Sequence, residues 1–513
     1  MATLASVVPW KSVAVAAGLY FATVAFYRLF LHPLARFPGP KLAAATRWFE
    51  AYYDIIQNGQ YTSKIAKMHE RYGPIIRISP DELHINDPSF FPTLFRHEGR
   101  WDKYAWAVNA QSIHGATIFT ADHDQHKARR QPLNPCFSKA TVASRQGMIR
   151  KKLVRLCERI SEFAETGRVL DIGAAISAFQ RDVLTNYVLG KSYDDLEKED
   201  FNAGMMIVAQ AGGKVWRLTK HFPWYGPTLL SIPKDFLIKH GDELTANFMR
   251  YGKASEEETE RLLSDAASAL STPGEKAQPT IVHAIVHSDL PPEDKTTARM
   301  WSDVATVTGA GFETTASVLR LVIYHVFNNS QILERLRAEL ATVAPPLPSL
   351  SDEEPELRVL EQLPYLTAIL MEGMRLSPAL GTRLQRIAPD RELVYDKWRI
   401  PAGTPVGMTT LFMHMNEELY PDPTRFEPQR WVDVDARKKA DKTYAPFSRG
   451  ARICLGMHLA WIDMYLVMSA LVRRFNFDLR GLTDDYFVFE SDQFIIGTKG
   501  KGVLEVNVTR RKP

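Results

Sequence analysis

A lone cysteine in a loop framed by two glycines is the feature that most constrains the fold of this chain. The loop reads Phe447-Ser448-Arg449-Gly450-Ala451-Arg452-Ile453-Cys454-Leu455-Gly456 and runs into an apolar stretch typical of a helix. A thiolate is a strong ligand for haem iron, and it needs positive or hydrogen-bonding surroundings to stay deprotonated. Glycines let the backbone turn sharply and a flat macrocycle approach, and N–H groups of the following helix can face the sulfur. The pattern therefore favours a haem-thiolate site over a buried structural cysteine.

This stretch resembles the cysteine-ligand loop of cytochromes P450, and further motifs of that family occur in the correct order from Phe37 to the C-terminus. The resemblance implies a mainly α (α+β) chain with the cytochrome P450 fold, a helical haem domain with small β-sheets. It also implies haem b (iron protoporphyrin IX) as cofactor and Cys454 as the metal ligand. Phe447, Arg452 and Gly456 would then contact the cofactor.

Cysteine usage and charge exclude other classes of protein. The chain has three cysteines, Cys136, Cys157 and Cys454, and so small and odd a number argues against a disulfide framework and favours a cytosol-facing location. No pair of them has CxxC or zinc-site spacing. The formal net charge of +4 is evenly spread and gives no indication of nucleic-acid binding. The length alone predicts two domains, whereas the resemblance implies one catalytic domain over residues 34–513.

An apolar N-terminal segment predicts a membrane anchor. Residues 13–31 carry Arg28 as their only charge, and this length nearly spans a bilayer core. A cleaved signal peptide is the main alternative, but no convincing small-residue cleavage site follows. Lys11 alone precedes the segment and several cations follow it, so the positive-inside rule places the large C-terminal part in the cytosol. We expect a single-pass anchor at residues 1–33 in the endoplasmic reticulum membrane.

The remaining sequence reads mostly as helix with a few short strands. Amphipathic helices are expected from about residue 139 to 270, with an interruption at Gly212-Gly213. The proline-bounded segment 222–227 predicts either a membrane-dipping lip of an access channel or a packed loop. Further expected elements are a hairpin over 75–85, helices over 297–328 and 365–376, and strands over 384–387, 393–400 and 487–508.

Glu372 and Arg375 lie three residues apart on one face of a predicted helix, and Arg430 follows in a proline-bearing segment. Taken alone, such a pair is usually an exposed salt bridge of little energetic value. Its order before Cys454 matches the P450 pattern, in which the glutamate and two arginines lock together beneath the haem. The resemblance therefore implies a structural role for these three residues, as a brace for the cysteine loop.

The long helix carries a polar interruption, Ala310-Gly311-Phe312-Glu313-Thr314-Thr315. Gly311 costs about 1 kcal/mol relative to alanine unless something approaches it or the helix opens, and an unpaired Glu313 would be unfavourable among apolar neighbours. In isolation this is a tolerated polar kink. Beside the cysteine loop it resembles the P450 oxygen-activation groove, which implies that Thr314 and Glu313 are catalytic residues that supply protons.

Haem carboxylates need cationic partners. His126 and Arg130, one helical turn apart, match the propionate-binding helix of the family, with His126 where many members have tryptophan. Arg386 and Arg452 match two further propionate-binding arginines. For His126, a surface histidine in a basic stretch is the alternative.

The resemblance also implies the electron donor. The chain shows neither a Rossmann glycine fingerprint nor a flavin module, so electrons from NADPH would arrive through NADPH-cytochrome P450 reductase, with cytochrome b5 as a second candidate donor. Lys127 and Arg129 either face such a partner or belong to an ordinary solvated basic helix.

The implied activity is haem-thiolate monooxygenation of a lipophilic substrate. The opening residues 27–34 and 37–44, with Trp216-Arg217 and segment 222–227, resemble fungal microsomal P450s of secondary metabolism, of the trichodiene-oxygenase type. A terpenoid or polyketide intermediate is the implied substrate. The candidate pocket walls are small or apolar: Val304, Ala305, Thr308, 379–382 and 495–497.

Two other functions stay open at this point. A haem-thiolate isomerase or dehydratase needs no O2, and the Glu313-Thr314 pair argues against it. A non-catalytic haem-binding protein would turn nothing over, so loss of Thr314 would change no activity.

Overall fold

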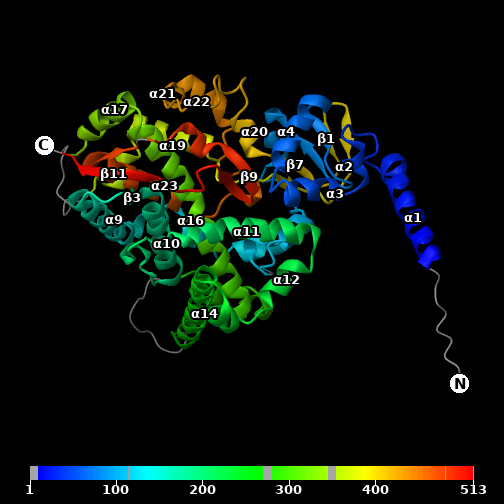
Figure 1. The fold of residues 1–513 in the computed structure, drawn as a ribbon, viewed down its shortest axis with the longest axis horizontal. Helices are drawn as coiled ribbons and strands as arrows, with labels where there is room; N and C mark the ends of the chain where they lie inside the picture. Colours follow the sequence, from blue (N-terminus) through cyan, green and yellow to red (C-terminus); the bar gives the residue numbers. More distant parts are fainter. Residues whose placement is uncertain (1–9, 114, 270–279, 345–353, 480, 512–513) are drawn as a thin grey trace.

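The body of the protein is built around one long buried helix. The computed structural model describes residues 10–113, 115–269, 280–344, 354–479 and 481–511. Helix α16, Thr297–Phe327, packs along α10, Ile172–Leu189, and both are buried over most of their length (Figure 1). The other long helices are α4 (Tyr61–Tyr72), α9 (Gln146–Thr166), α11 (Gly204–His221), α14 (Glu243–Ala269), α17 (Ser330–Ala341), α19 (Pro364–Leu376) and α23 (Met457–Arg474).

Short helices connect these elements. They are α2 (Lys41–Ala45), α3 (Trp48–Ala51), α5 (Phe91–Leu94), α6 (Ala105–Asn109), α7 (His123–Arg130), α8 (Lys139–Ser144), α12 (Tyr225–Leu230), α13 (Lys234–His240), α15 (Ile281–Val286), α18 (Leu357–Leu360), α20 (Thr410–His414), α21 (Gln429–Val432) and α22 (Val434–Asp441).

The strands form four small sheets within the described residues. A four-stranded sheet has the order β1 (Ile75–Arg77), β2 (Leu83–Ile85), β7 (Val406–Met408), β4 (Leu384–Arg386). A three-stranded sheet has the order β3 (Leu170–Asp171), β11 (Glu505–Arg510), β8 (Phe475–Asp478). Two antiparallel pairs complete the set, β5 (Leu393–Tyr395) with β6 (Trp398–Ile400) and β9 (Phe489–Gln493) with β10 (Ile495–Thr498).

The main elements expected from the sequence are confirmed. The hairpin pairs Ile75 with Ile85 in antiparallel register, and α16 and α19 follow the expected bounds within a residue. The expected break at Gly212-Gly213 is wrong, because both glycines lie inside α11. A Cβ on Gly213 would come within 2.4 Å of the Gln493 carbonyl oxygen, so this glycine permits close packing of a continuous helix against β9.

The N-terminal helix stands apart from the body. Helix α1, Trp10–Phe26, continues through the turn Tyr27–Leu31, and this 22-residue apolar span is unburied and projects beside the four-stranded sheet (Figure 1). At about 1.5 Å per residue it is about 33 Å long, the thickness of a bilayer core. The Arg28 guanidinium donates a hydrogen bond to the Ala45 carbonyl, which ties the end of this helix to the body of the protein.

Candidate active site

The cysteine loop is shaped by one glycine and opened by another. Gly450 has φ +72°, and a Cβ there would lie 2.5 Å from the Arg96 carbonyl oxygen, so only glycine fits. The Cys454 N–H donates to the Phe447 carbonyl at 3.0 Å and closes the loop just before α23 begins. Gly456 has no protein atom within 4 Å of its Cβ position. At Gly450, the expected close approach is therefore made by the protein's own backbone. At Gly456, the space beside the Cα atom is open.

Cys454 combines dense surroundings with an accessible sulfur. The residue is solvent-accessible, although many protein atoms surround it. Burial raises the pKa of Cys454, while a hydrogen bond from the Gly456 N–H and the charge of Arg130 act in the opposite direction. The loop thus provides two of the influences that a thiolate requires, and a metal cation would supply the third.

Four cationic or basic side chains gather in the interior near this loop. Burial lowers the pKa of Arg386 to about 9 and that of Arg452 to about 10, and Arg452 also repels Arg386. Burial and nearby cations lower the pKa of His126 to about 2 and that of Lys103 well below its usual range. Arg386 and Arg452 donate only to backbone carbonyls within the described chain. Asp102 and Asp122 partly offset the charge of Arg452, whereas no carboxylate offsets that of Arg386 within the described residues. Buried positive charge of this kind fits the two carboxylates of haem b.

Helix α7 carries the other predicted contacts. His126 is buried, so the alternative of a surface histidine is wrong. Arg130 donates to the Ile453 carbonyl at 2.6 Å, directly beside Cys454. Arg129 is bound to Asp294 at 2.6 Å and does not lie free on a partner-facing surface, whereas Lys127 is exposed.

The predicted brace is assembled, and its Glu372–Arg375 pair is fully buried. Arg375 forms a two-pronged pair with Glu372 at 2.7 and 2.8 Å, and neither side chain has measurable exposure. Arg430 Nε lies 3.4 Å from Glu372 Oε1, and Trp431 Nε1 donates to Oε2 at 2.8 Å. The alternative of a surface salt bridge is therefore wrong, because a buried carboxylate with this many donors is a structural anchor.

His414 connects this brace to the cysteine loop, and sequence reasoning missed it. Its Nδ1 lies 3.1 Å from the Arg375 carbonyl, and its Nε2 accepts the Ala445 N–H at 3.2 Å. This pattern requires a neutral ring with the proton on Nδ1. Burial, followed by the charge of Arg375, lowers the pKa of His414 to about 3, in agreement with that state. A lone histidine before a proline-rich loop carries no sequence signal for such a bridge.

The polar interruption lies where α16 becomes accessible. Gly311 is explained by packing, because a Cβ there would meet the Leu184 side chain of α10 at 2.2 Å. Gly309 and Ala310 are exposed, and Thr314 Oγ1 donates back to the Ala310 carbonyl at 2.9 Å. Thr314 thus holds a hydroxyl on an accessible face of the helix, in a weak local bond that a water could replace.

Glu313 has a partner that the sequence analysis did not identify. Arg320, two turns along α16, donates to Glu313 Oε2 at 2.9 Å and to Ser177 Oγ of α10 at 2.7 Å. Glu313 Oε1 has no hydrogen-bond partner among the residues that the structure describes. The spacing of seven residues places both side chains on one helix face, but only the position of α10 shows that this face is buried.

The candidate pocket walls divide into two groups. Val304 belongs to the apolar core and Thr308 is buried with its hydroxyl bonded to the Val304 carbonyl, so the expectation that they form pocket walls is wrong. Ala379, Ile495 and Ile496 do line a common pocket with Glu313 and Arg320.

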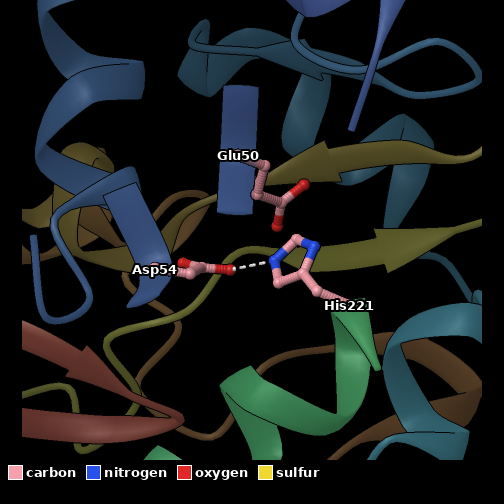
Figure 2. Close-up of side chains that lie close together, drawn as sticks. All are labelled: Glu50, Asp54 and His221. Carbon is pink, nitrogen blue, oxygen red and sulfur yellow. Dashed lines mark hydrogen bonds and ion pairs between the residues drawn. The ribbon is translucent and has the colours of Figure 1, made fainter. Parts of the chain in front are cut away.

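A second buried polar cluster lies at the C-terminal end of α11. Figure 2 shows Glu50, Asp54 and His221 turned toward one another, with Asp54 bonded to His221 at 3.0 Å. Lys220 Nζ lies 3.1 Å from Glu50 and 2.6 Å from Asp54, so an ammonium already takes the place of a cation. Burial raises the pKa of Glu50, but Arg383 and Lys220 outweigh it and hold that pKa below its ordinary value. This cluster fastens α11 to the N-terminal helices rather than holding a metal.

Comparison with known proteins gives a consistent result. The family model described as Cytochrome P450 matches residues 40–504. The tryptophan 6-hydroxylase of Fusarium equiseti is 36% identical, over 95% of this chain and 95% of that protein. The cytochrome P450 monooxygenase TRI4 of Fusarium sporotrichioides is 34% identical, over 92% of this chain and 89% of that protein.

A solved structure agrees at the level of the fold. The crystal structure of another cytochrome P450 superposes with a TM-score of 0.68 at 14% identity, over 88% of this chain and 95% of that one. The predicted fold, a helical haem domain with small sheets, is therefore confirmed. The chain belongs to the cytochrome P450 family, and it is a haem-dependent monooxygenase.

Proposed function

We propose that Cys454 is the thiolate ligand of haem b in this monooxygenase, and that Thr314 and Glu313 supply protons from the opposite side. The observation that carries this proposal is the exposed Cys454 near the buried cations Arg386 and Arg452, which form no ion pair within the described residues. His126, Arg130, Arg386 and Arg452 hold the haem carboxylates in this proposal, and Phe447 and Gly456 contact the macrocycle from the loop.

The protein's own part in the reaction is to position groups and deliver protons. When bound, haem b supplies the oxygen chemistry, in which O2, two electrons, two protons and R–H give R–OH and water. Thr314 exchanges its bond to the Ala310 carbonyl for one to a water and so holds that water at the reacting centre. Glu313 passes protons to this water. An isomerase or dehydratase would require neither residue.

Membrane attachment and electron supply extend the proposal. We place residues 1–33 in the endoplasmic reticulum membrane as a single-pass anchor, and residues 34–513 in the cytosol as the catalytic domain. An apolar surface near the anchor supports this arrangement: Trp224 is 64% exposed and Trp48 62% exposed, and Phe222 contacts the Trp48 ring. This exposure favours the membrane-dipping alternative for segment 222–227. NADPH-cytochrome P450 reductase, with cytochrome b5 as a second candidate, would approach the side of the cysteine loop, where Lys127 is exposed.

The proposed substrate is a lipophilic secondary-metabolite intermediate, a terpenoid or polyketide. Ala379, Ile495 and Ile496 give the pocket an apolar wall beside α16. Relatives named as tryptophan and N-acetyltryptophan 6-hydroxylases make indole compounds the competing substrate class.

The test uses microsomes that contain the full chain and a reductase. Terpenoid, polyketide and indole compounds are supplied with NADPH under 18O2, and products that gain one labelled oxygen atom are sought by mass spectrometry. We expect labelled product from the parent chain and from Cys136→Ser, and none from Cys454→Ser. Cys136 is a suitable control because it is a second free cysteine and lies outside the loop in sequence. Labelled product from Cys454→Ser would contradict the proposal.

A further inference from the structure

A pocket with both polar and apolar lining residues leads from the molecular surface to the buried acid of α16. Its lining includes Glu313, Ser317, Arg320 and Ser377 at the inner end, and Tyr486 and Val503 further out. Val503 is 42% exposed, so the pocket reaches solvent beside the C-terminal strands. Water therefore has a route to Glu313 along this pocket, whose wall also carries Ala379, Ile495 and Ile496.

The inner end of this pocket is connected to the predicted proton-delivery residues. Ser317 donates to the Thr314 carbonyl at 2.8 Å, and its hydroxyl lies 3.5 Å from that of Ser377. Glu313 Oε1, buried and without a protein partner, is available to a water in the pocket. Buried carboxylate oxygens are rarely left without a partner, so an ordered water is the expected ligand of Oε1.

Arg320 fixes the orientation of this carboxylate. Its guanidinium is held by Ser177 Oγ at 2.7 Å and by the Met206 sulfur at 3.8 Å, and it grips Glu313 Oε2 at 2.9 Å. A guanidinium does not release its proton in proteins, so Arg320 cannot itself pass protons. Held by contacts with α10, α11 and α16, Arg320 instead keeps Oε2 of Glu313 hydrogen-bonded and leaves Oε1 free for a water.

We propose that Arg320 is a positioning residue for proton delivery, and that protons enter through the pocket that opens at Val503. The inference rests on the proposed role of Glu313. In each turnover the protons pass from solvent water to Glu313 and on to the water at Thr314, while the electrons come from the reductase. Hydrogen peroxide formation uses the same O2, two electrons and two protons, so protons that do not arrive by this path end with the electrons in hydrogen peroxide instead of in R–OH and water.

The test compares Arg320→Gln, Arg320→Lys, Glu313→Gln and the double variant Glu313→Gln/Arg320→Gln in the haem-loaded full chain. For Arg320→Gln we expect a roughly tenfold loss of product per NADPH, a matching gain in peroxide, and a larger solvent deuterium isotope effect. Arg320→Lys should recover part of the loss because it keeps the charge. The double variant should be no worse than Glu313→Gln, because both residues serve one path. Product formed with iodosylbenzene, which supplies an oxygen atom without protons, should be unchanged.

Two measurements separate this role from a general loss of structure. Val503→Phe narrows the mouth of the pocket and should lower product per NADPH, whereas Val488→Phe, at a residue 43% exposed and outside the pocket lining, should not. In thermal unfolding without haem, the double variant should lose less than the sum of the two single losses, because the removed partners face each other.

The outcomes distinguish this inference from the proposed function. If Glu313→Gln keeps full coupling, the proton role of Glu313 fails and this inference fails with it. If Glu313→Gln uncouples but Arg320→Gln and Val503→Phe do not, only the inference is overturned. An equal loss with iodosylbenzene in Arg320→Gln would assign Arg320 a purely structural role and also overturn it.

Discussion

The two sides of the candidate site differ in how completely their polar groups are satisfied. Beside the cysteine loop, Glu372 and Arg375 are fully buried, and both carboxylate oxygens of Glu372 accept hydrogen bonds. His414 extends the same network to Ala445. On α16, within the described part of the chain, the Thr314 hydroxyl bonds only to its own helix and one oxygen of Glu313 has no partner. The first arrangement resists change, and the second leaves groups available to water. This difference supports the proposal that one side holds a ligand and the other exchanges protons.

Disrupting the network of Glu372, Arg375 and His414, which is the rigid side of the site, should have the largest effect. Glu372→Gln leaves the buried charge of Arg375 without its partner, and the loss of one member of such a pair costs about 3–5 kcal/mol. We expect little folded, haem-loaded protein, measured by soluble yield and haem absorbance. Arg430→Gln is the matched control: this arginine is 15% exposed with Nε 3.4 Å from Glu372, so its loss should be mild. Equal yields for both variants would contradict the distinction.

Changing Thr314 or Glu313, which form the accessible side of the site, should leave the fold intact and lower the coupling of NADPH use to product. Thr314→Ala removes the hydroxyl at the accessible face, and we expect a loss of coupled turnover on the order of 100-fold with normal haem content. Thr308→Ala serves as control, because Thr308 makes the same kind of back-bond, to the Val304 carbonyl, but faces the core. Product per NADPH is the measurement, and similar uncoupling in both variants would remove the special role of Thr314.

Removing one of the buried cations near the cysteine loop should have opposite effects on thermal stability and on haem binding. Arg386→Met removes a buried charge that has no carboxylate partner, so the chain without haem should become more stable to heat. The same change should weaken haem binding by about tenfold, because one charge-assisted hydrogen bond to a haem carboxylate is lost. Haem titration and thermal unfolding measure the two effects. Lys127→Met, at an exposed position, should alter neither.

A pH dependence of the rigid side is the smallest expected effect. The pKa of His414 is lowered to about 3 by burial and by Arg375, whereas in the unfolded chain it lies near 6.5. The unfolded chain therefore binds more protons between these values, and the contribution of neutral His414 to stability is lost as the pH falls from about 6.5 toward 3. His414→Gln should flatten the fall of the melting temperature over this range. An unchanged slope would show that other groups cause it.

The sequence predicted the rigid side more completely than the accessible one, for a physical reason. The cysteine loop, Glu372, Arg375 and Arg430 occur in local motifs, and the structure brings the last three together as expected. Arg320 could not be found in this way, because its importance depends on α10 and α11 closing over one face of α16. Gly311 shows the same limit: its motif suggested an approach or an opening, and only the packing of Leu184 explains it.

The carbon monoxide difference spectrum of the reduced, haem-loaded chain tests the central claim most directly. Spectra would be recorded for the parent chain, Cys136→Ser and Cys454→Ser, with haem content measured in each. The account predicts a thiolate-type band in the first two proteins and its loss in Cys454→Ser, because only Cys454 offers an accessible sulfur in the site. A thiolate-type band that survives in Cys454→Ser, or is absent from well-folded parent protein that contains haem, would contradict it.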